Sequence, residues 1–263
     1  MRNAIFKFLP LALGLFLGWM IVNPPVWMQG LGPLAWVVNL ALAALLLLSA
    51  VPIFALASLP AELQIRPLGE PVPVELQRLR EQFLALGFKD VGPPLRVEIA
   101  PAATLLGFVH PTEPVYGTAF RTGTVPAKVS HDFVSILDGD RGGLTTNTDP
   151  QGAALPAAPG GFRQVLPGQT LGALFQAHLE GIRYLREAGV GVRPVSSDAF
   201  QRDMSMALRR QRETFLSSPV RGSLLLFWRA ATKQVPFVGR LREQQIASRQ
   251  LQSLRGGETQ RAF

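Results

Sequence analysis

The sequence predicts a membrane-anchored α+β protein, in which a transmembrane hairpin of two hydrophobic helices precedes a domain with a mostly antiparallel sheet and flanking helices. Three observations lead to this fold class. Charged residues make up only 17% of the chain, against about 25% in a typical soluble domain. A long N-terminal stretch contains no charge at all. Further along, short alternating segments are separated by turn residues, and longer segments have apolar residues at helical spacing.

The uncharged stretch is too long for one membrane span. The 54 residues from Phe8 to Ala61 contain no Asp, Glu, Lys or Arg. A single helix of that length would measure about 80 Å, whereas the hydrocarbon core of a bilayer is about 30 Å thick. Two spans joined by a turn fit this thickness, and we place them at about residues 4–22 and 34–58. The intervening segment contains Pro24, Pro25, Gly30 and Pro33, which favour a reversal of the chain.

Tryptophan and basic residues indicate how this hairpin is oriented. Trp19, Trp27 and Trp36 fall around the turn, and tryptophan is enriched at the headgroup layer. The turn has no charge, whereas Arg2 and Lys7 begin the chain and a basic region ends it. The positive-inside rule therefore predicts that both termini are cytoplasmic. We expect a multi-pass protein of a bacterial-type inner membrane.

A cleaved signal peptide is the alternative for the first hydrophobic segment, because Arg2 and Lys7 form a basic N-terminal region. No small-x-small cleavage site follows Val22, and the pair Ala55 and Ala57 lies after the second segment. Retention of the segment as a span is therefore favoured. The chain contains no cysteine, which removes disulfides and thiol chemistry from consideration.

The charge of the remaining chain is unevenly distributed. Residues 61–199 hold 12 Lys+Arg and 14 Asp+Glu, a net charge of −2, whereas residues 200–263 hold 12 and 4, a net charge of +8. We divide the chain accordingly into a hairpin at 1–60, an α+β domain at 61–199 and a basic helical region at 200–263. A solvated helix face whose charge helps to set the membrane topology explains such a region, and anionic lipid headgroups also suit it. Nucleic acid is not expected, because no recognition module or stacking aromatic accompanies the arginines.

Apolar residues recur at helical spacing in three segments of the α+β domain and the basic region. The first segment follows Pro73 and is expected to end at Gly87, the second runs from Thr170 to Gly189, and the third begins near Phe200. Their apolar faces comprise Leu76, Leu79, Phe83 and Leu86; Leu171, Leu174, Phe175, His178, Ile182 and Leu185; and Phe200, Met204, Leu208 and Phe215.

Alternating segments predict the strands. Residues 95–99 form one half-buried strand. Residues 104–109 and 115–121 form a hairpin, and residues 129–137 and 144–148 form a second. Their short turns require antiparallel pairing, because a parallel return takes about a dozen residues or more. The segment 150–168, with four Pro and four Gly in 19 residues, is expected to be a loop.

No standard catalytic or nucleotide-binding motif is present. His131 and Asp132 are adjacent on a predicted strand, so their side chains should point to opposite faces and cannot easily share a metal. His178 is expected to be a buried structural residue, and His110 precedes a proline in a turn. The sequence therefore predicts no catalytic residue, no cofactor and no metal site.

The loop from Asp138 to Asp149 also has features of a calcium site. Acidic residues occupy its first and third positions, with Asp149 at the twelfth. Its fifth position is glycine, however, and its flanks are strands rather than helices. A Gly- and Asp-rich hairpin turn explains the same residues.

The segment Leu224–Trp228 consists of five consecutive apolar residues between two arginines. It is hydrophobic on all sides, so it should be buried in the fold, in the membrane surface or in a partner protein. The residues expected at a membrane surface or partner are Arg209, Arg210, Arg212, Arg221, Leu224, Phe227, Trp228 and Arg229.

Together these features predict a non-catalytic accessory or assembly subunit, whose cytoplasmic domain contacts a larger membrane complex or the anionic lipid surface. Membrane lipids and other membrane-protein subunits are the expected partners. The alternative is a membrane-associated enzyme acting on a lipid or a membrane-linked substrate. A pocket that contains His110, His131 or Asp132 with a perturbed pKa favours the enzyme, whereas a large exposed apolar patch without such a pocket favours the subunit.

Overall fold

The computed structural model describes residues 34, 37–41, 65–97, 103–122, 128–140, 142–149, 158, 160–217 and 239–259. The chain divides into two compact units. One comprises Met1–Leu59 with Phe215–Thr232, and the other comprises Pro60–Thr214 with Lys233–Phe263. The second unit is a mixed sheet with flanking helices, so the predicted α+β class is confirmed for this unit.

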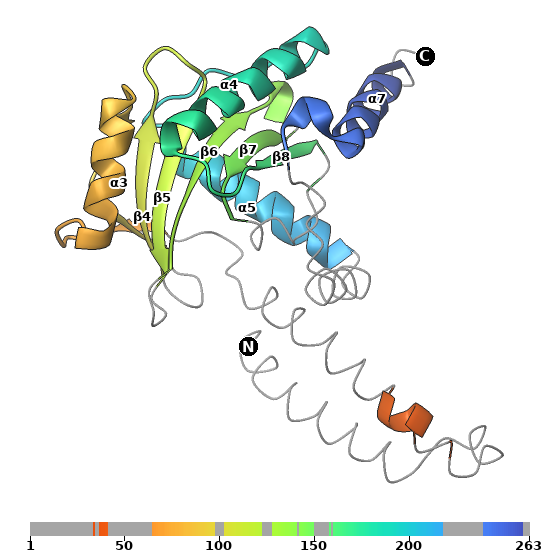
Figure 1. The fold of residues 1–263 in the computed structure, drawn as a ribbon, viewed down its shortest axis with the longest axis horizontal. Coiled ribbons are helices and arrows are strands. Elements are labelled where there is room, and N and C mark those ends of the chain that lie inside the picture. Colours follow the sequence, from red (N-terminus) through yellow and green to blue (C-terminus); the bar gives the residue numbers. More distant parts are fainter. Residues whose placement is uncertain are drawn as a thin grey trace. The chain divides into compact units, whose positions relative to one another are not determined.

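Among the described residues, its sheet has eight strands in the order β1-β3-β4-β5-β6-β7-β8, with β2 paired to β4 (Figure 1). All pairs are antiparallel except β7 and β8, which are parallel. Both predicted hairpins are therefore confirmed, as β4–β5 and β6–β7. The strands are β1 (Ile65–Pro67), β2 (Lys89–Asp90), β3 (Leu95–Val97), β4 (Ala103–Val109), β5 (Tyr116–Thr122), β6 (Val129–Ile136), β7 (Gly143–Asn147) and β8 (Gly161–Val165).

Helices cover both faces of this sheet. Helices α3 and α4 contact strands on one face, and α5 crosses the other (Figure 1). The three helices predicted from apolar spacing are confirmed. The helical elements are α3 (Val74–Ala85), η2 (Asp138–Asp140), α4 (Leu171–Glu187), α5 (Phe200–Ser217), η4 (Leu241–Glu243) and α7 (Gln245–Thr259).

Helix α3 ends at glycine, as the sequence predicts. Gly87 has a φ of 88°, in the left-handed region that glycine adopts without strain. Its N–H donates to the carbonyl of Leu84 at 3.0 Å, and the N–H of Phe88 donates to that of Phe83 at 3.1 Å. The rings of Phe83 and Phe88 also pack edge to face at 5.4 Å. This is the Schellman pattern with its hydrophobic contact.

Helix α4 begins where the hydroxyl of Thr170 accepts from the N–H of Ala173 at 3.3 Å, which is an N-cap. Its last helical residue is Glu187, and Gly189, with a φ of 80°, follows the C-cap. Between them, Gly181 lets the helix lie close to the sheet, because a Cβ there would be 2.9 Å from both Gln164 and Leu144. The helix therefore packs its backbone against β7 and β8.

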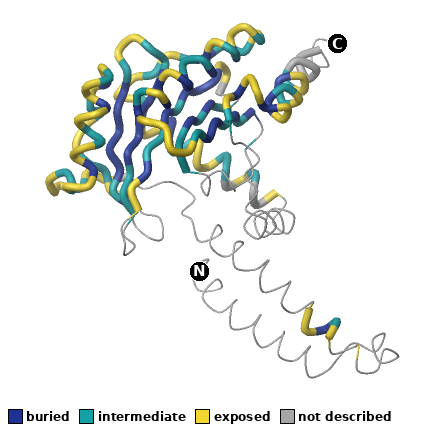
Figure 2. The backbone as a smooth tube through the Cα atoms, in the orientation of Figure 1, coloured by how far each residue is buried: buried dark blue, intermediate teal, exposed yellow. Residues whose placement is uncertain are grey.

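The sheet separates two hydrophobic cores, and its central strands are the most buried part of the unit (Figure 2). The larger core lies between the sheet and α3, α4, η4 and α7, and it includes Phe83, Phe133, Leu174 and Leu241. The smaller lies between the opposite face and α5, and it includes Tyr116 and Phe200 among others.

One sequence expectation fails in the segment 150–168. Residues 161–165 form β8 rather than loop. Phe162 and Val165 are each 1% exposed, so this strand is held by burial and by pairing with β7. The many Pro and Gly residues around it predicted a loop, although the four residues from Phe162 to Val165 are suited to a strand.

Little of the predicted hairpin lies within the described residues. Leu34 and residues 37–41 are helical, and the rest of the spans predicted at 4–22 and 34–58 lie outside the described part. Within that part, none of the helices combines the length and the apolar character needed to cross a bilayer.

Candidate functional site

A groove lies between α5 and the sheet face that carries the smaller core. It encloses about 380 Å³, within the range of small-molecule sites, which is about 300–1,000 Å³. The sheet supplies its floor, and α5 supplies the other wall through Met204, Ala207, Leu208 and Gln211. The remaining lining residues are Val97, Ala103, Leu105, Thr118, Phe120, Thr122, Ser130, Asp132, Val134, Thr145, Asn147, Asp149 and Arg163.

Strand register brings the polar residues of this groove together. Thr118 on β5 pairs with Asp132 on β6, which pairs with Asn147 on β7. Residues that pair across strands point to the same face, so the three side chains form one row. In the next row, Val134 pairs with Thr145 and Thr145 with Arg163. The groove thus has a polar region set in mainly apolar walls.

Asp132 is the titratable group at the centre of this row. Burial raises its pKa to about 6, and the charge of Asp149 acts in the same direction. A hydrogen bond from Asn147 and the charge of Arg163 oppose the increase. Desolvation dominates because removing a carboxylate from water penalises its charged form. The carboxylate of Asp149 itself lies 2.7 Å from the ammonium of Lys128.

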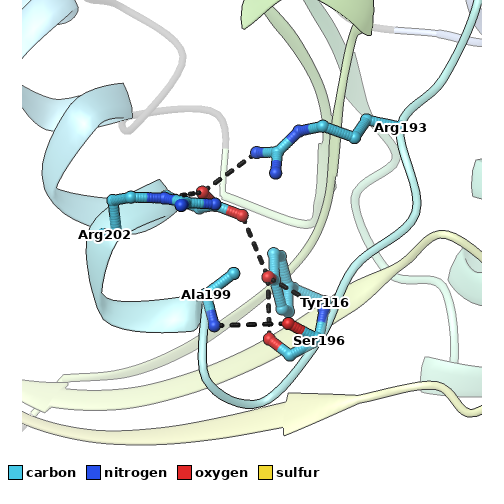
Figure 3. Close-up of polar contacts among 6 residues, drawn as sticks. Tyr116, Arg193, Ser196, Ala199 and Arg202 are labelled. Carbon is cyan, nitrogen blue, oxygen red and sulfur yellow. Dashed lines mark hydrogen bonds and ion pairs between the residues drawn. The ribbon is translucent and has the colours of Figure 1, made fainter.

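A buried polar cluster fixes α5 above the groove (Figure 3). The carboxylate of Asp203 accepts a hydrogen bond from the Tyr116 hydroxyl at 3.0 Å and lies 2.9 Å from the Arg193 guanidinium. The hydroxyl of Tyr116 also lies 3.0 Å from the carbonyl of Ser196. Because the Asp203 side chain is fully buried, these contacts hold the start of α5 against β5. Burial raises the pKa of Tyr116 to about 12.

A second polar network lies on the opposite face of the sheet, around His178. The amide of Gln164 donates to the Thr146 hydroxyl at 2.9 Å, and the Ser135 hydroxyl donates to the carbonyl of Pro114 at 2.7 Å. Because the Thr146 hydroxyl already accepts from Gln164, it donates its own proton to Nδ1 of His178 at 2.8 Å. Because the Ser135 hydroxyl already donates to Pro114, it accepts from Nε2–H of His178 at 2.9 Å. Each hydroxyl therefore has one donor and one acceptor partner.

This network makes His178 a structural residue, as the sequence predicts. Its side chain is fully buried, and burial lowers its pKa to about 3. The hydroxyl of Ser135 already donates elsewhere, so His178 cannot act as its base. The Gln164 carbonyl oxygen accepts from the N–H of Leu241 at 2.8 Å, which ties η4 into the same network.

The other histidines are placed separately from the groove. His110 lies in the β4–β5 turn, where Nδ1 accepts from the N–H of Glu113 at 3.0 Å and the ring packs on Phe88 at 4.9 Å. His131 is adjacent to Asp132 on β6 but does not line the groove. The expectation that His131 and Asp132 face opposite sides of a strand is therefore confirmed.

The loop considered for calcium has other partners in the fold. The backbone N–H of Asp138 donates to the carbonyl of Gly191 at 3.0 Å, and its carboxylate lies so close that a Cβ on Gly191 would collide with it. Asp149 pairs with Lys128. Among the residues that the structure describes, no group of three His, Asp or Glu side chains could hold a metal ion.

A cleft of about 330 Å³ lies between α4 and η4. Four of its charged side chains form two ion pairs. Arg240 lies 2.6 Å from Glu180, and Arg242 lies 2.7 Å from Glu187. These ion pairs attach η4 to α4, so the cleft is better explained as a seam between elements than as a binding site.

The structure places only part of the surface set expected from the sequence. Arg209 is exposed on α5, and Arg210 is half-buried and lines a smaller cavity of about 110 Å³ beside Gly161. The side chain of Arg212 lies outside the described part of the chain. The remaining residues of the set also lie outside the described part of the chain: Arg221, Leu224, Phe227, Trp228 and Arg229, and the interfacial residues Trp19, Trp27 and Trp36.

Sequence reasoning missed the groove itself. It singled out Asp132 but not Asn147 or Arg163, which the fold brings beside it. The position of Asn147 could have been found by counting along the β6–β7 hairpin. Arg163 could not, since β8 was not predicted. No protein-family model, curated protein or solved structure matches this chain.

Proposed function

We propose that this protein is a membrane-anchored, non-catalytic accessory or assembly subunit, whose cytoplasmic α+β domain contacts a larger membrane complex or the anionic lipid surface. Its partners in this proposal are membrane lipids and other membrane-protein subunits. The spans at residues 4–22 and 34–58 form the anchor, and both termini lie on the cytoplasmic side of the inner membrane.

The observation that carries the proposal is the inverted exposure of the short helical segment that is described near the N-terminus. Leu34, Val37 and Leu40 are 58%, 64% and 61% exposed, whereas Asn39 is 1% exposed. A helix in water has the opposite arrangement, with polar residues outside and apolar residues inside. Polar residues within membrane helices usually face the interior of the bundle. This arrangement supports a lipid environment for the segment.

The exposed arginines of α5 support contact with an acidic surface. Arg202 and Arg209 are exposed, and each Lys or Arg near an anionic membrane contributes about 1 kcal/mol of attraction. An exposed helix face with such charges can equally meet acidic side chains of a partner subunit.

Photo-crosslinking in intact membranes tests the contact. A photoreactive residue at Arg209 on α5 should crosslink to lipid or to a membrane protein. The same residue at Glu81, an exposed charged position on α3, serves as the matched control and should not. Absence of crosslinks from Arg209, or equal crosslinking from both positions, contradicts the proposed contact.

The groove meets the criterion set out above for the enzyme, a pocket that contains Asp132 with a perturbed pKa, so the enzyme is the second candidate. Asp132 lies in an apolar cavity, and its pKa is raised to about 6. A carboxyl group with a pKa near the working pH suits general acid or base catalysis on a membrane-linked substrate. Replacement of Asp132 by Asn separates the two candidates. A folded, abundant but inactive D132N variant would identify the enzyme, whereas function that follows protein abundance identifies the subunit.

A further inference from the structure

The groove beside α5 contains a buried hydrogen-bond acceptor that the fold leaves unused. The side-chain oxygen Oδ1 of Asn147 is inaccessible to solvent and has no hydrogen-bond partner within the described part of the chain. Buried acceptors are nearly always satisfied, and each exception requires an explanation. The amide group of Asn147 donates to Asp132, so its oxygen is left for another donor.

The walls near this acceptor suit an apolar chain. Val97, Leu105 and Phe120 line the groove from the sheet, and Met204 and Leu208 line it from α5. Leu208 is 41% exposed, which opens this side of the groove to solvent. A ligand that filled the groove would cover this apolar surface, and such burial is the main favourable term in binding small molecules.

The charges around the polar row limit which polar group a ligand with an apolar chain can carry. Asp132 and Asp149 would repel an anion, whereas Arg163 lines the same groove and Lys128 lies beside Asp149, so a cation would also meet like charge. The two acceptors at the centre of the row, the carboxylate of Asp132 and Oδ1 of Asn147, require donors. A neutral group with hydroxyls supplies donors without adding charge.

We propose that the groove binds a neutral, hydroxyl-bearing amphiphile of the monoacylglycerol type. One hydroxyl donates to Asp132, and a second donates to Oδ1 of Asn147, which a side-chain movement must first expose because no solvent reaches it in this structure. The acyl chain lies between the sheet and α5. The inference goes beyond the proposed membrane contact and is independent of it, because every residue that carries it belongs to the α+β unit.

Equilibrium binding of radiolabelled 1-monolauroylglycerol to the full chain in a detergent-free polymer tests the site, with the empty polymer as background. Dodecanoic acid and dodecylamine are the competing probes, since they share the chain length and differ in head-group charge. We expect saturable binding of one monolauroylglycerol per chain, with competition by either charged probe at least about tenfold weaker.

Two variants and a matched control locate the binding. Ala207 on α5 is exposed and lines the groove, and Ala85 is an exposed alanine on α3. Ala207→Phe should fill the groove and lower the affinity about tenfold or more, whereas Ala85→Phe should leave it unchanged. Asn147→Leu removes the unused acceptor, together with the amide that donates to Asp132, with little change in volume. It should lower the affinity for monolauroylglycerol about tenfold.

The proposal is overturned if the wild-type chain shows no saturable binding, or if either charged probe competes as well as the neutral one. Equal affinity for the wild type and Asn147→Leu also overturns it. If Ala207→Phe does not keep the wild-type Tm, Asn147→Leu decides alone. The crosslinking experiment at Arg209 is unaffected by any of these results, so failure of the two proposals can be told apart.

Discussion

At the scale of single residues, His178 couples the stability of the fold to pH. Burial lowers its pKa to about 3, from about 6.5 in the unfolded chain. The unfolded state therefore binds more protons between these values, and the free energy of unfolding falls as the pH falls through this window. The contribution of His178 is fully present above about pH 6.5.

We expect His178→Leu to lower the free energy of unfolding by about 1–3 kcal/mol at pH 7, because the hydroxyls of Ser135 and Thr146 lose their partner. As the pH falls from 6.5 to 3, the difference in free energy of unfolding between the wild type and the variant should decrease by up to about 1.4 kcal/mol per pH unit. Denaturant unfolding at several pH values measures this difference. A gap that stays constant with pH contradicts the assignment.

Asp132 should act with the opposite sign. Its pKa is raised from 3.8 to about 6, so the folded state binds more protons in this window and stability falls as the pH rises through it. Asp132→Asn removes the cost of burying the charge. The variant should be more stable than the wild type above pH 6, by on the order of 2 kcal/mol, and this advantage should vanish near pH 4. A pH-independent difference in Tm would contradict the shift.

At the scale of elements, the attachment of α5 depends on Asp203. Its buried carboxylate pairs with Arg193, whose side chain is 25% exposed, and with Arg202, whose side chain is 67% exposed. Asp203→Ala should destabilise the protein by about 3 kcal/mol, since it leaves the Arg193 charge largely buried without this partner. Arg202→Ala is the control and should change stability by less than about 1 kcal/mol. Thermal unfolding of both variants checks the order.

Two glycines of α4 provide a second pair of substitutions at this scale. In Gly172→Ala, the added Cβ would contact only Leu86, at an ordinary van der Waals distance of 3.8 Å. The substitution should therefore stabilise the helix by about 0.5 kcal/mol. Gly181→Ala places its Cβ 2.9 Å from Gln164 and Leu144 and should destabilise the protein by about 1–3 kcal/mol through overpacking. The same sign for both Tm shifts would contradict the close packing of α4 on the sheet.

At the scale of the whole molecule, the distribution of charge sets the expected topology. The turn at residues 23–33 is uncharged, whereas Arg2, Lys7 and the region 200–263 are basic. A reporter fused after Phe263 should be active in the cytoplasm, and one inserted near Gly30 should be active outside the inner membrane. A C-terminal reporter active outside the membrane would overturn both the topology and the proposed localisation.

The sequence by itself was sufficient to predict the local elements. Helix α3 with its end at Gly87, helix α4 with its start at Thr170, and the hairpins β4–β5 and β6–β7 all follow from periodicity and turn residues. Such features depend on interactions between residues near in sequence, so they can be read from short stretches. His131 and Asp132 point to opposite faces of β6, and this too follows from a local rule, because successive side chains alternate along a strand.

Tertiary structure alone decided what these elements bring together. Strand β8 is stabilised by parallel pairing with β7 and by burial, neither of which a local pattern records. Asp132, Asn147 and Arg163 meet because three strands are held in register, and the groove exists because Tyr116 and Asp203 fix α5 above them. Desolvation then raises the pKa of Asp132, and it depends on all the atoms that exclude water around the carboxylate rather than on the residues adjacent in sequence.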